Sequence, residues 1–450
     1  MSPQLPQPKA HVLLGNLPEF AADTLAFILD MRRYGDLVRF WFGPFPAHIA
    51  NHPDYAHQIM VTDADKYYKD RTTKTVLKPV LGNGLFVSDS DFWKRQRKLV
   101  QPAFHSKRIG DYAQVIVDYA AEVAEQWQSG QTIEVDTAMT ALTMRVIAKV
   151  LFDADVSKEA HEVGETITEV LEMVNKRFNS LLLMPDWIPT ASNRQMKNAV
   201  ERLDNLIYGF INERRKAAAD KGDLLSMLLM AQDDDASRMT DKQVRDEAMT
   251  LFGAGHETTA VTLTWTWYLL SQHPDIEQNL LAELEQVLGG RKPTLADLPK
   301  LQYTEMIVKE AMRLYPAAWI VSRENMEDVN IAGHPIKKNN IIMINIYGMH
   351  RDARFFDNPD EFRPERFSPE NEKLIPKYAY IPFGGGPRVC IGNQFAMMEA
   401  KLILATLAPH FHLSLAPGHV VKPERVFTLR PKYGMRMVAT AREQTAEPTL

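Results

Sequence analysis

The segment from Thr240 to Ser271 constrains the fold most strongly, because its apolar residues keep a helical spacing well beyond the length of an average helix. A helix of this length would cross a whole domain. Most of the chain from Pro53 to Leu288 also has helical spacing, including a separate helix over Pro274 to Leu288, as do Leu301 to Tyr315 and Asn393 to Ala408. The chain is therefore expected to be mainly α-helical.

Short strands are expected in two regions. Alternating apolar residues in Val38 to Phe42 and Ala47 to Ala50, joined by a Gly43-Pro44 turn, predict an antiparallel hairpin after a helix over Glu19 to Tyr34. Further strand-like pieces lie between Val321 and Ile344, where glycine, proline and asparagine residues indicate turns. The fold class that follows is mainly α with small β-sheets.

The chain of 450 residues shows no Gly/Ser linker, charge block or internal repeat, so we expect one domain over residues 1–450, with a partly β lobe at 1–50 and a flexible tail at 440–450. A net charge of −5 gives no attraction to nucleic acid. No run of roughly 18 apolar residues is present to form a transmembrane anchor, and the N-terminus lacks the pattern of a signal peptide. We therefore expect a soluble, cytoplasmic, monomeric protein.

Cys390 is the only cysteine of the sequence, which excludes an internal disulfide and any metal site that needs several thiolates. It lies in a glycine-rich loop, Phe383 to Gly392, directly before a helix. Backbone N–H groups of this loop and the positive end of the helix would stabilise a thiolate, which is the ligand that haem iron needs for O–O cleavage. The alternatives are an inert cysteine and a phosphate loop, but no Gly-Lys-Ser/Thr follows the glycines.

The middle of the long helix contains Ala254-Gly255-His256-Glu257-Thr258-Thr259. A mid-helix glycine costs about 1 kcal/mol relative to alanine, so the small residues indicate space for a flat cofactor beside the backbone. The Thr258 hydroxyl would compete for a helix carbonyl and open a groove, while Glu257 would relay protons from bulk solvent and Thr258 would hold reduced oxygen by hydrogen bonding. The alternative is an ordinary core helix. A zinc-protease helix is excluded because Ala260 stands where its second histidine is required, and a dinucleotide fingerprint because Thr258 replaces its third glycine.

The cysteine loop matches the signature F-x-x-G-x-R-x-C-x-G through Phe383, Gly386, Arg388, Cys390 and Gly392, and in this the sequence resembles the cytochrome P-450 family. The long helix matches the family motif A-G-x-[D/E]-T-[T/S], and the resemblance covers nearly the whole chain. It implies the cytochrome P-450 fold, with haem b between the long central helix and the helix after the cysteine loop. Cys390 would be the axial ligand of the iron, and Ala254 and Gly255 would lie against the haem.

Other residues receive roles from the same resemblance. Phe383 would pack beneath the macrocycle, and Arg388 would pair with a propionate. Trp93 and Arg97 match the family's W-x-x-x-R helix, and Arg323 matches a strand arginine. Both motifs imply contacts with the propionates, with solvated surface charge as the alternative.

Glu310 and Arg313 lie three residues apart and so share a helix face, and their neighbours are apolar. A buried pair needs further partners, and Arg366 in Pro364-Glu365-Arg366-Phe367 is the candidate. These segments resemble the E-x-x-R and P-E-R-F motifs of the family. The resemblance implies a structural role for them, which is to fix the core around the cysteine loop.

The implied activity is that of a monooxygenase that inserts one atom of O2 into a hydrophobic organic substrate, by hydroxylation or epoxidation. Electrons would come from NAD(P)H through a ferredoxin- or flavodoxin-type donor and its reductase, since the sequence encodes no iron–sulfur or flavin domain. One alternative is a haem-thiolate isomerase or peroxide-using peroxygenase. A haem-based gas sensor is another, although a sensor has no need for an acid beside an alcohol.

The resemblance further implies that the substrate pocket is lined by Arg71 to Phe86, Val174 to Pro189, the helix before Ala254, Ala317 to Ile320 and Val426 to Leu429. Apolar side chains in these segments suit a lipophilic substrate, with fatty acids, alkanes, terpenoids and steroids as candidates. The large ones are Phe86, Leu181, Leu182, Leu183, Trp187, Trp319 and Phe427.

Overall fold

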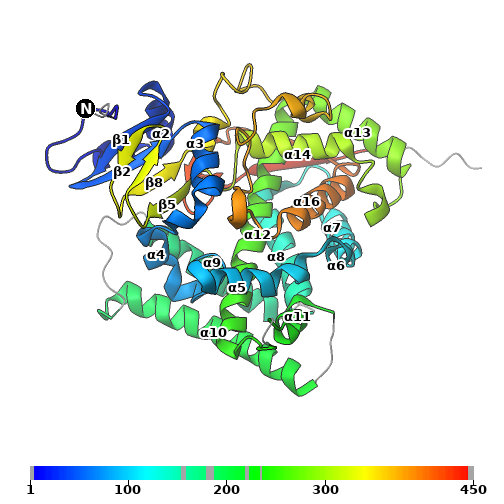
Figure 1. Ribbon diagram of the computed structural model, residues 1–450. Coiled ribbons are helices and arrows are strands. Elements are labelled where there is room, and N and C mark those ends of the chain that lie inside the picture. Colours follow the sequence, from blue (N-terminus) through cyan, green and yellow to red (C-terminus); the bar gives the residue numbers. More distant parts are fainter. Residues whose placement is uncertain (1–4, 154–158, 179–186, 218–221, 234–235, 444–450) are drawn as a thin grey trace, which may run out of the picture.

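The computed structural model describes residues 5–153, 159–178, 187–217, 222–233 and 236–443. Most of them are helical, and a mixed β-sheet lies at one side of the helical part (Figure 1). The helices are α1 (Leu17–Ala22), α2 (Thr24–Asp30), α3 (Pro53–His57), α4 (Arg71–Leu81), α5 (Ser90–Val100), α6 (Ser106–Gly110), α7 (Ala113–Gln126), α8 (Val135–Phe152), α9 (Glu159–Phe178), α10 (Ala191–Ala217), α11 (Leu224–Met230), α12 (Asp241–Gln272), α13 (Pro274–Leu288), α14 (Gln302–Leu314), α15 (Ile346–Met349) and α16 (Asn393–Leu407). The predicted class, mainly α with small sheets, is confirmed.

The longest described helix, α12, runs through the middle of the helical part (Figure 1). It begins after Thr240, whose hydroxyl accepts a hydrogen bond from the Gln243 N–H while the Gln243 side chain accepts one from the Thr240 N–H. Most of its side chains are buried, and Trp265 and Trp267 are completely enclosed. The predicted long helix is thus confirmed to within one residue at each end.

The largest sheet joins the N-terminal hairpin to strands from the second half of the chain, in the order β1-β2-β8-β5-β3. Its strands are β1 (Leu37–Phe42), β2 (Phe45–Ala50), β8 (Ile341–Ile344), β5 (Val321–Asn325) and β3 (Tyr67–Tyr68). The β2–β8 pair is parallel and the other pairs are antiparallel. Both predicted strand regions are therefore confirmed, and β1 and β2 of the first join β5 and β8 of the second in one sheet.

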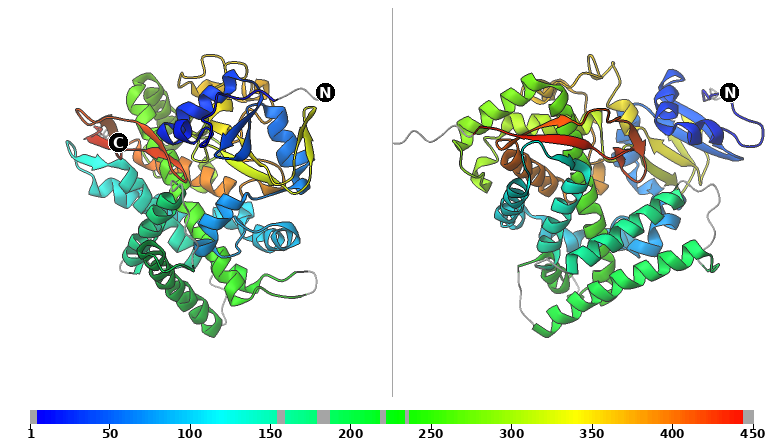
Figure 2. Two further views of the ribbon diagram at one scale, coloured as in Figure 1. Left: turned by 90° about the vertical axis from the view of Figure 1, so that its left-hand side faces the viewer. Right: turned by 180° about the vertical axis from the view of Figure 1, so that it is seen from behind.

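A second sheet has the order β4-β12-β9 and is visible when the molecule is seen from behind (Figure 2). Its strands are β4 (Thr132–Glu134), β12 (Arg436–Ala441) and β9 (Phe411–Leu415). Two small pairs complete the β-structure, β6 (Val329–Ile331) with β7 (His334–Ile336) and β10 (Pro423–Arg425) with β11 (Leu429–Pro431). Residues 440 and 441 of the expected tail belong to β12, and residues 444–450 lie outside the described residues.

The expected continuous helix over Glu19 to Tyr34 is wrong, because the chain is extended at Asp23 (φ −153°, ψ 93°). The Asp23 carboxylate instead accepts a hydrogen bond of 3.0 Å from the Ala26 N–H and so begins a new helix, α2. The break brings the rings of Phe20 and Phe27 together at 5.6 Å. Among the described helices, none has the length and apolar character needed to cross a membrane.

A fully buried ion cluster connects α14 to the irregular segment after α15. Arg313 Nε and Nη2 donate to the two oxygens of Glu310 at 2.7 and 2.8 Å, and Arg366 Nε donates to Glu310 Oε1 at 3.2 Å. Arg313 also donates to the carbonyl oxygens of His350, Pro359 and Glu361. Buried charges are stable only when every polar atom has a partner, and here the backbone supplies the missing ones.

We predict that Arg313→Ala lowers the free energy of unfolding by about 3–5 kcal/mol, because it leaves the Glu310 charge buried and unpaired. Arg363→Ala is the matched control, since the Arg363 side chain pairs with the exposed Asp357, and such pairs contribute about 1 kcal/mol or less. Denaturant midpoints of the two variants would test this. An equal loss of unfolding free energy in the two variants would show that the buried cluster contributes no more to stability than an exposed ion pair.

Candidate active site

The cysteine loop closes tightly before α16. The Cys390 N–H donates to the Phe383 carbonyl oxygen at 3.0 Å, and Gly384 and Gly386 have φ values of +70° and +64°, which disfavour other residues. A Cβ atom at Gly386 would lie 1.9 Å from the Met60 carbonyl oxygen. Gly386 therefore lets the loop contact the backbone after α3 directly, and this contact fixes the position of the cysteine.

The sulfur of Cys390 is accessible to solvent, yet protein atoms surround it closely. This partial burial raises the pKa of the thiol, while the Gly392 N–H and the nearby Arg97 lower it without offsetting the burial. The Gly392 N–H thus acts in the expected direction, toward the thiolate, but the burial of the sulfur outweighs it. A metal cation bound to the sulfur would supply the missing stabilisation, because coordinated thiols are deprotonated.

Trp93, Arg97 and Arg388 hold the cysteine loop against α5. Arg97 Nη1 donates to the Val389 carbonyl oxygen at 3.0 Å. Arg388 donates to Asp89 at 2.6 Å, and its guanidinium lies 4.3 Å from the centre of the Trp93 ring. Arg388 therefore has a carboxylate partner within the protein, in addition to any propionate, and Trp93 contacts Arg388.

Positive charge is in excess beside this loop. Arg323 is buried, and its guanidinium donates a hydrogen bond to the carbonyl oxygen of its neighbour Ser322. Burial and the charge of Arg388 lower the pKa of Arg323 to about 10. Burial together with Arg323 and Arg388 also lowers the pKa of Lys69 well below its usual value. Such a group of cations stabilises anions, and the carboxylates of haem fit it.

The predicted opening in α12 lies at Ala254, which is exposed although the helix around it is mostly buried. Thr258 Oγ1 donates to the Ala254 carbonyl oxygen at 2.9 Å, and Thr143 of α8 donates to that of His256 at 3.0 Å. Gly255 does not face the opening, because a Cβ atom there would lie 3.0 Å from Ile147 Cδ1 of α8. Gly255 thus permits close packing of two helices, and Ala254 is the residue that leaves space.

Glu257 is held by a residue that is distant in sequence. Thr428 Oγ1, in the connection between β10 and β11, donates to Glu257 Oε1 at 2.8 Å, whereas Glu257 Oε2 has no hydrogen-bond partner among the described residues. Burial raises the pKa of Glu257, although Thr428 and Arg430 oppose this effect. The carboxyl group is therefore biased toward its protonated form. The sequence placed Thr428 in the expected pocket segment Val426 to Leu429, but no feature of the sequence indicated its hydrogen bond with Glu257.

Three aromatic rings meet from segments that were predicted to line the substrate pocket. The Phe427 ring lies 5.8 Å from that of Phe86 and 6.0 Å from that of Phe178 at the end of α9. The Phe427 N–H donates to the side chain of Asn175, also on α9. Trp187 is 81% exposed and does not join this group. The predicted lining residues Leu181, Leu182 and Leu183 lie outside the described residues.

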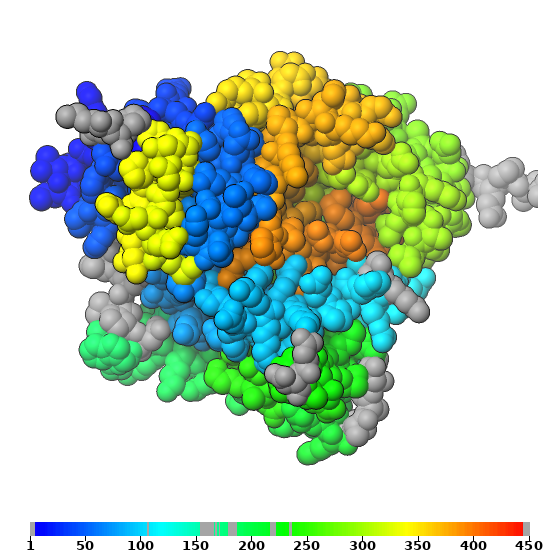
Figure 3. Space-filling model, in the orientation of Figure 1, coloured from blue at the N-terminus to red at the C-terminus, as the bar shows by residue number. Residues whose placement is uncertain are grey.

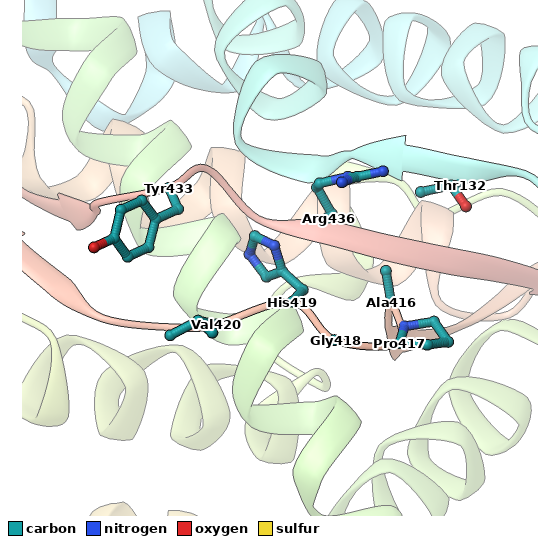
Figure 4. Close-up of a pocket in the computed structure, with 8 residues that line it drawn as sticks. All are labelled: Thr132, Ala416, Pro417, Gly418, His419, Val420, Tyr433 and Arg436. Atoms are coloured by element: carbon teal, nitrogen blue, oxygen red, sulfur yellow. The ribbon is translucent and has the colours of Figure 1, made fainter.

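A separate open groove of about 520 Å³ lies on the surface beside β12 (Figure 4). It is lined by residues of the connection after β9 and of the chain around β4 and β12, and none of them belongs to the cysteine loop or to α12. This groove is therefore distinct from the site at Cys390. Its lining residues are Thr132, Ala416, Pro417, Gly418, His419, Val420, Tyr433 and Arg436.

Comparisons with known proteins identify the family of the chain. The family model described as Cytochrome P450 matches residues 5–436. The chain is 38% identical over 420 residues to cyclooctatin synthase of Streptomyces melanosporofaciens, covering 93% of this chain and 91% of that protein. It is 33% identical to cyclooctat-9-en-7-ol 5-monooxygenase of the same organism (91% and 90% covered) and 32% identical to pentalenene oxygenase of Streptomyces avermitilis (97% of each). The chain therefore belongs to the cytochrome P-450 family and is a monooxygenase with an iron haem as its cofactor.

We predict that Gly386→Ala destabilises the protein by about 3 kcal/mol or more, from the sum of left-handed backbone strain and the clash with Met60. Gly384→Ala is the control, because Gly384 has a similar φ but nothing within 4 Å of the added Cβ atom, and it should cost about 1–2 kcal/mol. Thermal midpoints and haem content of the two purified variants would be compared. Similar losses would show that backbone strain alone requires glycine in this loop.

Glu399 of α16 is a buried carboxyl group that the sequence did not single out. It is 1% exposed, and within the described part of the chain neither of its oxygens has a partner with good hydrogen-bond geometry, although the Thr259 hydroxyl of α12 lies nearby. Burial raises the pKa of Glu399 to about 8 from a usual value of 4.5. The group is therefore protonated in the folded chain at neutral pH, where an unfolded chain would have lost the proton.

We predict that Glu399→Gln stabilises the protein increasingly as the pH rises. Between pH 4.5 and about 8 the wild-type folded chain retains a proton that the unfolded chain has released, so its stability falls across this window. Glutamine cannot ionise, and the variant avoids this loss. Thermal midpoints of wild type and variant at pH 5.5 and 8.5 would be compared, with the exposed Glu285→Gln as control. A constant difference at both pH values would contradict the prediction.

Proposed function

We propose that this monooxygenase oxidises a bulky cyclic terpenoid, with the haem held between Cys390 and the Ala254 opening of α12. The observation that carries the proposal is the accessible Cys390 sulfur beside an excess of buried positive charge. Cys390 would hold the iron of haem b, and Arg323 and Lys69 would hold its propionates. When bound, the haem supplies the activation of O2. Arg97 and Arg388 contribute further donors while they hold the loop in place.

In this proposal Glu257 supplies protons, and the Thr258 hydroxyl donates a hydrogen bond to bound oxygen. Glu257 Oε1 accepts from Thr428, so Oε2, which has no partner among the described residues, is the oxygen that would carry a proton. The Thr258 hydroxyl donates to the Ala254 carbonyl oxygen at the opening, and by rotating it can donate to O2 or water instead. The carboxyl group is buried, so protons are delivered without exposing the site to bulk solvent.

The substrate class is supported by the aromatic rings and by the relatives. Phe86, Phe178 and Phe427 form an apolar surface that suits a rigid hydrocarbon skeleton. Two similar proteins carry names that specify oxidation of cyclooctat-9-en-7-ol and of pentalenene. A cyclic terpenoid is therefore favoured over the fatty acids, alkanes and steroids that the sequence left open.

We further propose that electrons come from NAD(P)H through a separate ferredoxin- or flavodoxin-type protein. The chain has one cysteine, which is too few to hold an iron–sulfur cluster. The orange segment that contains the cysteine loop reaches the surface, near the blue and cyan helices (Figure 3). Arg97 and Trp93 of α5 contact this loop, and the same helix exposes Lys94. A negatively charged donor would be attracted to that face.

The test uses Cys390→Ala and Thr258→Ala with O2, NADPH and a surrogate ferredoxin and reductase. We predict that Cys390→Ala lacks the red-shifted absorption band of the reduced, CO-bound, thiolate-ligated haem. Thr258→Ala should keep this band but form at least about tenfold less product per NADPH consumed.

Thr266→Ala is the control, since Thr266 also donates to a carbonyl of α12 but is completely buried away from the opening. Pentalenene and related cyclic terpenes would serve as substrates. A Cys390→Ala variant with wild-type spectrum and turnover would overturn the proposal, and turnover with peroxide alone would favour a peroxygenase.

A further inference from the structure

Two neighbouring carboxylates near the start of α12 bind the backbone between α4 and α5. The Asn83 N–H donates to Asp246 Oδ2 at 2.8 Å, and the Leu85 N–H donates to Glu247 Oε2 at 2.9 Å. The other oxygen of Glu247 accepts from Gln96 Nε2 of α5, also at 2.9 Å. We call residues 82–89 the α4–α5 connection. Two consecutive residues of α12 thus bind this connection through its backbone N–H groups.

The contact is too close for side chains on the connection. A Cβ atom at Gly82, where φ is +59°, would lie 2.0 Å from Asp246 Oδ1, and one at Gly84 would lie 2.2 Å from Thr250 Oγ1. Both glycines therefore allow the backbone to reach the carboxylates and the helix surface. Close approach and paired hydrogen bonds at the same place indicate a specific attachment of the connection.

Beyond this attachment, the connection carries groups of the proposed site. The Phe86 ring faces Phe427 and is covered by the Lys69 ammonium at 4.0 Å. Farther along, Asp89 accepts from Arg388 of the cysteine loop. A displacement of the part of the connection around Leu85 and Phe86 from α12 would therefore move one wall of the pocket, while the cysteine loop remains held to α5 by Arg97.

We infer that Glu247 is a positioning residue that holds the α4–α5 connection, and with it Phe86, in the conformation that binds bulky apolar ligands. The inference rests on the proposed function, because it takes Phe86 as part of the substrate pocket. Glu247 itself does not touch the ligand. It acts through the Leu85 N–H, and Asp246 acts in the same way through the Asn83 N–H.

The attachment is sensitive to pH. Burial raises the pKa of Glu247 to about 7, with a smaller contribution from Asp246, while Gln96 and the Leu85 N–H lower it. Both oxygens of Glu247 accept hydrogen bonds from N–H groups, so an added proton would point at a donor and break one bond. The attachment, and the affinity for bulky ligands, should therefore weaken as the pH falls through about 7.

Other charged groups around Glu247 are already engaged. On α12, Arg245 pairs with Asp246 and with Asp204 of α10, and Lys242 pairs with Asp246. On α5, Arg95 pairs with Asp233. Glu247 differs from these groups in that both of its oxygens accept hydrogen bonds from N–H groups of the connection and of α5.

The experiment compares two iron-binding probes on the holoenzyme, imidazole and the bulky aryl-substituted imidazole clotrimazole. We expect Glu247→Gln to bind clotrimazole roughly tenfold more weakly than wild type at pH 8, because the amide turns a donor toward an N–H group. The two proteins should differ little at pH 6. Imidazole, which is too small to reach Phe86, should bind both equally. For each probe, the ratio of the wild-type affinity to the variant affinity at a given pH is independent of the titration of the probe itself.

Asp241→Asn is the matched control, since Asp241 lies on the first turn of α12 but pairs with Arg215 on the surface. A second measurement needs no variant: hydrogen exchange of a peptide covering 82–89 in wild type, corrected for intrinsic rates, should speed up at pH 6 relative to pH 8. An unchanged clotrimazole ratio, an equal loss of imidazole binding, or pH-independent exchange would overturn the inference. Loss of the thiolate-haem spectrum in wild type would instead overturn the proposed function.

Discussion

The uninterrupted helix α12 is the constraint on which the rest of the structure depends. Its first turns bind the α4–α5 connection, its middle opens at Ala254, and its last turns bury Trp265 and Trp267. A helix is rigid over this length, so the spacing between these regions is fixed by the rise per residue. Pocket wall, oxygen-side groups and core are therefore positioned relative to one another by a single element.

Charge is buried in this protein in two contrasting ways. Around Glu310 every charged atom has a protein partner, which makes the cluster a stable part of the core. Around Arg323 the cations outweigh their partners, and the free energy of the folded chain would be lowered by an added anion. Glu257 and Glu399 are buried carboxyl groups whose pKa values are raised for the same reason, namely desolvation. Whether a buried ionisable group stabilises the core or remains able to bind an anion or a proton depends more on its hydrogen-bond and charge partners than on its burial.

Much of the fold follows from local pattern. The bounds of α13 agree with the prediction, and those of α12, α14 and α16 differ by at most one residue at each end, because apolar periodicity and proline or glycine stops are properties of neighbouring residues. Asp23 was missed because a helix cap competes with continuation of the helix, and the apolar spacing of Glu19 to Tyr34 does not register that competition. The single sheet formed by β1, β2, β5 and β8 also needed tertiary structure, since its strands lie far apart in sequence.

By itself the sequence determined the cysteine loop, the acid and alcohol of α12, and the pairing of Glu310 with Arg313, because each depends on spacing within one segment. Only the tertiary structure decided that Arg388 binds Asp89 and that Thr428 holds Glu257. It also decided that the pKa of the Cys390 thiol is raised, because burial depends on every atom around the sulfur. Contacts between distant segments leave no periodic signal, and desolvation is a property of the packed chain as a whole.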